Sequence, residues 1–142
     1  MVVDICHDDI EKATEVLKGI AADYDIGVIF GQNAPRSMRV GDAPTMYACL
    51  MEHKGVKIAV TRSPAATPNV IEPLMHEMAH AVIGHEDSMD QDREVCALVL
   101  KWAECLPPAL EELVRKETHV ILAEYDNIQG YYENTIDMRF AP

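Results

Sequence analysis

The sequence lacks any apolar run long enough to cross a membrane, since stretches such as residues 97–100 extend for only a few residues. It also lacks the pattern of a secretory signal peptide. The first nine residues carry acidic side chains where such a peptide has basic ones, and no apolar segment of the required length follows. The four cysteines form no Cys-x-x-Cys pair. We therefore expect a cytoplasmic protein without a membrane anchor, whose thiols stay reduced and pack as small apolar side chains.

Basic side chains are scarce in the chain. Asp and Glu number 24 against 12 Lys and Arg, which leaves a net charge of −12 at pH 7, and the acids are spread along the chain. Proteins that bind a phosphate backbone gather positive charge on one face, so we expect no direct binding to nucleic acid. A charge this negative ordinarily serves solubility. The alternative is an acidic surface that imitates DNA and occupies a partner protein.

The chain has the size of one compact domain. It has 142 residues, 49% of them hydrophobic, and no repeat or linker divides it, so we expect a single domain over residues 1–142. Apolar spacing predicts four helices, over residues 8–23, 70–84, 90–105 and 108–125. A strand at residues 25–30 and a hairpin from residues 46–51 and 56–60 are expected between the first two helices. An N-terminal helix, a small sheet containing an antiparallel pair and then further helices predict an α+β fold.

A His-Glu-x-x-His motif at residues 76–80 is the most informative pattern in the chain. Residues four apart on a helix lie one turn above each other, so the imidazoles of His76 and His80 can reach one zinc ion at about 2 Å. Glu77 lies about 100° round the helix from His76, within reach of a water molecule beside the metal, and its carboxylate can act as a general base. The apolar residues of this helix form a stripe on nearly the opposite side, which distinguishes the two histidines from ordinary core residues.

Catalytic zinc needs a third protein ligand and one open position. His85 points away from the histidine pair if the helix continues that far. Glu94, at the start of the next helix and beside its apolar stripe, is one candidate, and Asp87, Asp90 and Asp92 compete with it. Position in the sequence does not decide which of these four acids is the third ligand. An acid in the first turn of a helix also stabilises that end of the helix, so its presence there does not by itself indicate a ligand.

The residues around the motif resemble the ImmA/IrrE-type metallopeptidases of bacteria and their phages. In that family the His-Glu-x-x-His helix is followed by a helix of the form Glu-x-x-Ala-Asn-x-Phe-Ala, which ends in Leu-Pro. The matching segments here are residues 76–85, 94–97 and 106–107, within a region of resemblance that spans residues 45–107. Leu98 and Leu100 stand where the family usually has Asn and Phe.

This resemblance implies a minimal zincin-like domain, similar to the gluzincins, in which His76, His80 and Glu94 bind zinc and Glu77 is the catalytic base. It implies an endopeptidase whose protein or peptide substrate is a regulatory protein such as a transcriptional repressor. We expect the substrate to lie extended along the exposed edge of the hairpin, as an added strand. The candidates for stabilising the oxyanion are Tyr131, Tyr132 and His119.

Two other interpretations differ in what the metal does. A protein with the same zinc fold could inhibit or sequester a partner through its acidic surface, although the presence of all four expected site residues argues against lost catalysis. A purely structural zinc site would fill four positions, usually with cysteines, and no cysteine lies within the motif. The sequence leaves the substrate, the trigger of activity and the oligomeric state open.

Overall fold

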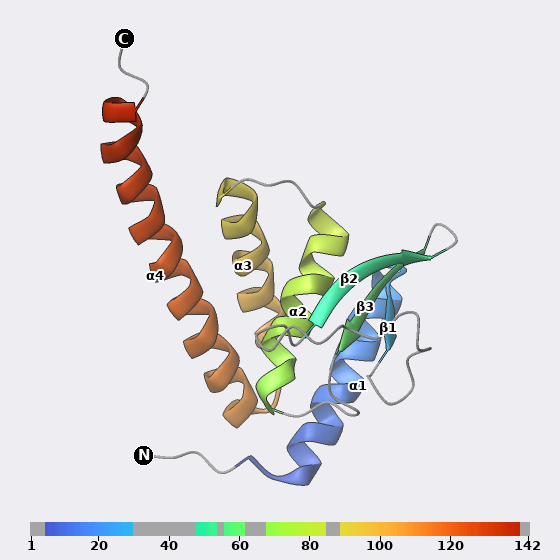
Figure 1. The fold of residues 1–142 in the computed structure, drawn as a ribbon. Coiled ribbons are helices and arrows are strands. Elements are labelled where there is room, and N and C mark those ends of the chain that lie inside the picture. Colours follow the sequence, from blue (N-terminus) through green and yellow to red (C-terminus); the bar gives the residue numbers. More distant parts are fainter. Residues whose placement is uncertain (1–4, 30–47, 54–55, 62–67, 85–88, 140–142) are drawn as a thin grey trace.

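The computed structural model describes residues 5–29, 48–53, 56–61, 68–84 and 89–139 (Figure 1). Within these ranges the elements are α1 His7–Asp23, β1 Gly27–Ile29, β2 Ala48–His53, β3 Val56–Thr61, α2 Pro68–Ile83, α3 Met89–Ala103 and α4 Pro108–Arg139. Helices beside a small sheet confirm the expected α+β class. α4 is longer than the helix expected over residues 108–125, because it continues through the tail that the sequence pattern left undecided.

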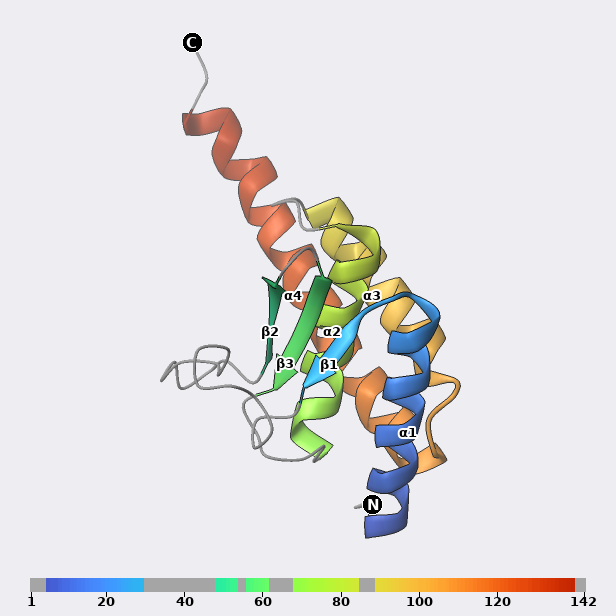
Figure 2. The same ribbon diagram turned by 90° about the vertical axis from the view of Figure 1, so that its right-hand side faces the viewer.

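The three strands form a mixed sheet in the order β1–β3–β2 (Figure 2). β2 and β3 pair antiparallel, with Cys49 opposite Val60 and His53 opposite Val56, so the expected hairpin is confirmed. β1 pairs with β3 in parallel, and Gly27 lies opposite Ile58. A Cβ atom at position 27 would lie 3.1 Å from Cγ1 of Ile58, so this close pairing suits a glycine. The order of the strands places β2 at one edge of the sheet.

Helix α2 is the central element of the fold, since it contacts the other three helices and the strands β2 and β3 (Figure 1). Its fully buried side chains include Ile71, Leu74, Met75 and Met78, which lie three or four residues apart along one face. Each buried side chain of this size stabilises the fold by roughly 1.5–3 kcal/mol. Together these contacts fix the rotation of α2 about its own axis.

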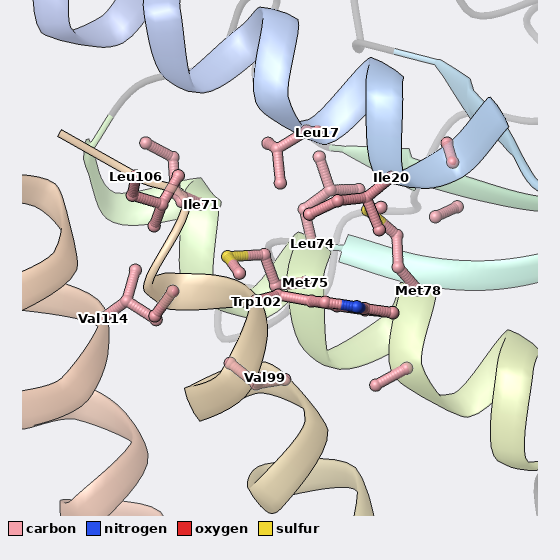
Figure 3. Close-up of a cluster of buried hydrophobic side chains, with 14 of the residues drawn as sticks. Leu17, Ile20, Ile71, Leu74, Met75, Met78, Val99, Trp102, Leu106 and Val114 are labelled. Carbon is pink, nitrogen blue, oxygen red and sulfur yellow. The ribbon is translucent and has the colours of Figure 1, made fainter. Parts of the chain in front are cut away.

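The other helices turn their apolar faces toward α2 in one hydrophobic core (Figure 3). Leu17 and Ile20 come from α1, Val99 and Trp102 from α3, and Val114 from α4. The core therefore contains residues of both α2 and α3, which pack directly against each other.

α4 packs along α3 and then continues past the rest of the fold (Figure 1). An ion pair joins the two helices at the outer end of their contact, with 2.8 Å between Nη2 of Arg93 and Oδ1 of Asp126. Among the helices in the described ranges, none combines the length and the apolarity needed to cross a bilayer.

Candidate metal centre

Helix α2 presents the two histidines of the motif on the side next to α3. The buried residues Leu74, Met75 and Met78 face the core and thereby determine where the rest of the helix surface points. His80 is buried, with 4% of its surface exposed, and the side chain of His76 is 16% exposed. Their ring centroids are 4.9 Å apart, with 68° between the ring planes. The predicted juxtaposition of the two imidazoles on one helix is confirmed, in a setting largely shielded from solvent.

The end of α2 orients the ring of His80. Nδ1 of His80 lies 3.3 Å from the carbonyl oxygen of Gly84. A carbonyl oxygen only accepts, so Nδ1 carries the hydrogen and Nε2 keeps a lone pair. Gly84 has a φ of +117°, a conformation that glycine adopts readily and other residues rarely do. The helix-ending glycine thus selects the tautomer in which Nε2 of His80 can bind a metal ion.

Asp92, in the first turn of α3, completes a group of three side chains. Its Oδ1 lies 3.5 Å from Nε2 of His80. One ligand atom each from His76, His80 and Asp92 lies within 4.8 Å of the other two, so the three residues could hold a metal ion. The side chain of Asp92 is 28% exposed, so the group is in contact with solvent at this residue.

Two of the other acids considered for this position, Glu94 and Asp90, lie outside this group. Glu94 is exposed and is not part of the group. Two residues on from Asp92, it is rotated about 200° round α3, so the helix cannot direct both side chains toward α2. The side chain of Asp90 is 96% exposed, and its Oδ1 lies 4.0 Å from Nη1 of Arg93. Asp87 falls outside the described residues, as does His85. The described geometry therefore supports Asp92, and the assignment of Glu94 stays a prediction implied by the resemblance.

The spacing and chemistry of this group fit a transition-metal ion. Two ligand atoms bound to one tetrahedral zinc ion at 2.0–2.2 Å lie roughly 3.3 Å apart. The 3.5 Å between Nε2 of His80 and Oδ1 of Asp92 is close to that value, and it exceeds the 2.7–2.9 Å of a charge-assisted hydrogen bond. Two imidazoles with one carboxylate are also a ligand set that first-row transition metals bind well.

Glu72 is a fourth polar residue at this site, one turn before His76 on α2. It is buried, with 4% of its surface exposed, and its Oε1 lies 3.9 Å from Nδ1 of His76. Within the described part of the chain, Oε1 of Glu72 makes no hydrogen bond. Burial, with added repulsion from Glu117 and Glu77, raises the pKa of Glu72 to about 7. The motif did not point to Glu72, although an acid four residues before a motif histidine is a visible signal.

α4 brings Tyr125 toward the same region. Burial, followed by the negative charges of Asp92, Cys96, Glu72 and Glu124, raises the pKa of the Tyr125 phenol to about 12. The phenol therefore stays protonated near neutral pH and can donate a hydrogen bond. The sequence pattern gave no reason to separate this tyrosine from the others on the last helix.

The residues expected to act in catalysis lie on α2 and α4. Glu77 is half-buried on α2, and its negative charge contributes to the raised pKa of Glu72. His119, one of three oxyanion candidates, is exposed on α4. The side chains of Tyr131 and Tyr132 lie outside the described part of the structure. Their roles stay predictions.

No protein-family model, curated protein or solved structure matches this chain. The function is therefore inferred from the residues of the candidate centre and the chemistry that they allow.

Proposed function

We propose that this chain is a zinc-dependent endopeptidase with a zincin-like fold, related to the ImmA/IrrE-type metallopeptidases that it resembles. The observation that carries the proposal is that Asp92 of α3 meets His76 and His80 of α2, the helix that also holds Glu77. Two histidines and a carboxylate are a ligand set of catalytic zinc sites, which keep one position open. Asp92 would then take the place that the resemblance gives to Glu94.

The chemistry divides between the ion and the side chains. A bound zinc ion would lower the pKa of a water molecule and polarise a peptide carbonyl. Glu77 accepts the proton of the attacking water and later passes it to the leaving amine, as a general base and then a general acid. His80 is held in its metal-binding tautomer by the Gly84 carbonyl, so the ligand needs no rearrangement before binding.

The sheet offers a place for a peptide substrate. β2 is an edge strand and packs against α2, the helix that carries the motif. An extended peptide could add to this edge through main-chain hydrogen bonds, with side-chain contacts setting the specificity. The resemblance makes a regulatory protein such as a transcriptional repressor the expected class of substrate.

The test is a Glu77→Gln substitution in zinc-loaded protein. The amide has nearly the same size but cannot accept the proton of water, so zinc content should stay at the parent value while cleavage falls about 100- to 10,000-fold. Cleavage is measured by mass spectrometry on a library of unstructured peptides. Glu112→Gln, the same change at an exposed position of α4, is the matched control and should cleave like the parent.

The interaction alternative predicts a different pattern. A cavity of about 690 Å³ lies between the start of α1 and the connection to α4, and acids including Asp8, Asp9 and Glu11 line it beside Leu106. If the protein acts by occupying a partner, Glu77→Gln should keep the biological effect, and charge reversal at Asp9 or Glu11 should remove it. A zinc-loaded Glu77→Gln protein with full biological effect would overturn the peptidase proposal.

A further inference from the structure

We propose that Glu72 is a positioning residue for His76, whose Nδ1–H it holds so that Nε2 is directed toward the metal ion. The inference rests on the proposed metal site and extends it to a residue outside the His-Glu-x-x-His motif. It is carried by the placement of two buried side chains on successive turns of α2.

The two side chains share one enclosed space. Glu72 and His76 are four residues apart, so they lie on the same face of α2, and the side chains are 5% and 16% exposed. Oε1 of Glu72 faces Nδ1 of His76 at 3.9 Å. The two ring nitrogens of an imidazole lie on different sides of the ring, so a partner at Nδ1 leaves Nε2 for a ligand.

A modest movement would turn this approach into a hydrogen bond. A charge-assisted N–H···O bond is about 2.8 Å long, roughly 1 Å shorter than the present distance, and small torsional changes in two long side chains cover that difference. Metal-binding histidines generally donate their second N–H to a carboxylate, a carbonyl or water, which fixes the ring and raises its basicity.

The two histidines would then have different partners. His80 donates to a neutral main-chain carbonyl, that of Gly84, whereas His76 would donate to a carboxylate. A carboxylate partner makes the imidazole the stronger ligand of the two.

Stability alone gives no reason to keep an acid at position 72. Glu72 is buried, with 4% of its surface exposed, and the negative charges of Glu117 and Glu77 are near enough to repel it. Burying a carboxylate in such surroundings is unfavourable, and an apolar replacement of similar volume is often neutral or stabilising. A residue that opposes folding in its surroundings is expected where function requires it.

The experiment compares zinc affinity in three variants with that of the parent. Glu72→Met keeps the length of the side chain and removes the acceptor, and it should bind zinc about 10- to 100-fold more weakly. Glu72→Gln keeps an acceptor oxygen without the charge and should recover most of this loss. Glu11→Met is the matched control, because Glu11 pairs with His7 at 3.0 Å with the same spacing of four residues, but at an exposed site on α1. It should bind zinc like the parent.

Two further measurements separate positioning from a role in folding. The visible spectrum of cobalt-loaded protein should change in Glu72→Met, because the ligand field of His76 changes, and should stay close to the parent in Glu11→Met. Chemical unfolding of the metal-free proteins should show Glu72→Met to be at least as stable as the parent.

Each contrary outcome identifies what has failed. Parent affinity in Glu72→Met, beside a His76→Ala protein that has lost zinc, would overturn the role of Glu72 and leave the metal site standing. A metal-free Glu72→Met protein that is unfolded would show that the carboxylate supports the fold, and would also overturn the inference. A parent protein that binds no zinc would overturn the proposed function itself.

Discussion

His76 and His80 occupy the same face of α2 but differ in how their rings are held. The partner of His80 is the main-chain carbonyl of Gly84, which a change of side chain elsewhere does not remove. The group facing His76 is the side chain of Glu72, which a single substitution can change in charge or length. In the proposed metal site, a change in the side chain that supports a histidine would therefore act through His76.

Cys96 lies one turn after Asp92 on α3, and its reactivity reports the same surroundings. Burial, with the charges of Glu72 and Asp92, raises the pKa of its thiol from 9.0 to about 11. The thiolate is the reactive form, and a rise of this size lowers its fraction about 100-fold near neutral pH. We predict that iodoacetamide at pH 8 modifies the exposed Cys6 and Cys105 and leaves Cys96 unmodified.

Peptide mapping by mass spectrometry checks this prediction. Because the pKa is raised, reaction at Cys96 in the folded protein should become appreciable only as the pH approaches 11, whereas unfolding should expose it at pH 8. Equal modification of Cys96 and Cys6 in folded protein at pH 8 would contradict the described burial.

The rotation of α3 decides which acid meets the histidines. Val95 and Val99 are fully buried and Trp102 nearly so, and these residues turn one face of α3 into the core. Asp92 lies one turn before Val95 on nearly the same side of α3, and its carboxylate reaches His80. The same rotation leaves Glu94 exposed. Which acid lies beside the histidines is thus a property of how two helices pack.

We predict that Asp92→Asn weakens zinc binding by about 100-fold or more, since loss of a supporting partner alone costs about 10- to 100-fold and this change removes a ligand charge. Glu94→Gln should bind zinc like the parent because its side chain is exposed. Competition with a chromophoric chelator measures both affinities. If Glu94→Gln releases zinc while Asp92→Asn retains it, the ligand set implied by the resemblance is the right one.

The end of α2 allows a second prediction at this scale. Gly84→Ala should destabilise the protein by about 1–3 kcal/mol, because a residue with a Cβ is strained at a φ of +117°. An added Cβ would meet Nε2 of Gln91 at 3.5 Å, an ordinary contact, so the strain comes from the backbone rather than from crowding. Zinc affinity should fall as well, because the Gly84 carbonyl orients His80.

Gly19→Ala is the control for this substitution. Gly19 lies within α1, and an added Cβ there has no atom within 4 Å. Alanine in a helix interior should stabilise the protein by about 0.4–1 kcal/mol. Urea unfolding of both variants gives the comparison, and equal stability of Gly84→Ala and the parent would contradict the strain at position 84.

At the scale of the whole molecule, a bound ion would join α2 to α3 through His76, His80 and Asp92. An ion that binds only the folded chain stabilises it by mass action, by about 4 kcal/mol at a free concentration 1,000 times the Kd. We predict a higher thermal midpoint with zinc and a lower one with a chelator, while His80→Ala responds to neither. Differential scanning calorimetry measures the midpoints. A zinc-dependent shift that persists in His80→Ala would place the ion elsewhere.

Local patterns in the sequence determined much of this protein. The apolar residues around Leu17, Leu74 and Val99 recur every three or four residues, and this spacing marks a helix at each of the three because such neighbours share a helix face. The hairpin followed from two apolar strands on either side of a glycine. The pairing of His76 with His80 followed in the same way, since a spacing of four residues is a property of one helix and needs no other element.

Only the tertiary structure decided which distant residues meet. Three features depend on how α2, α3 and α4 are rotated against one another: Asp92 lies beside the histidines, Glu72 is enclosed, and Tyr125 approaches the same region. That rotation results from many weak contacts between residues far apart in the sequence, none of which leaves a pattern along one segment. The parallel pairing of β1 with β3 has the same origin, because it joins strands that are not consecutive in the chain.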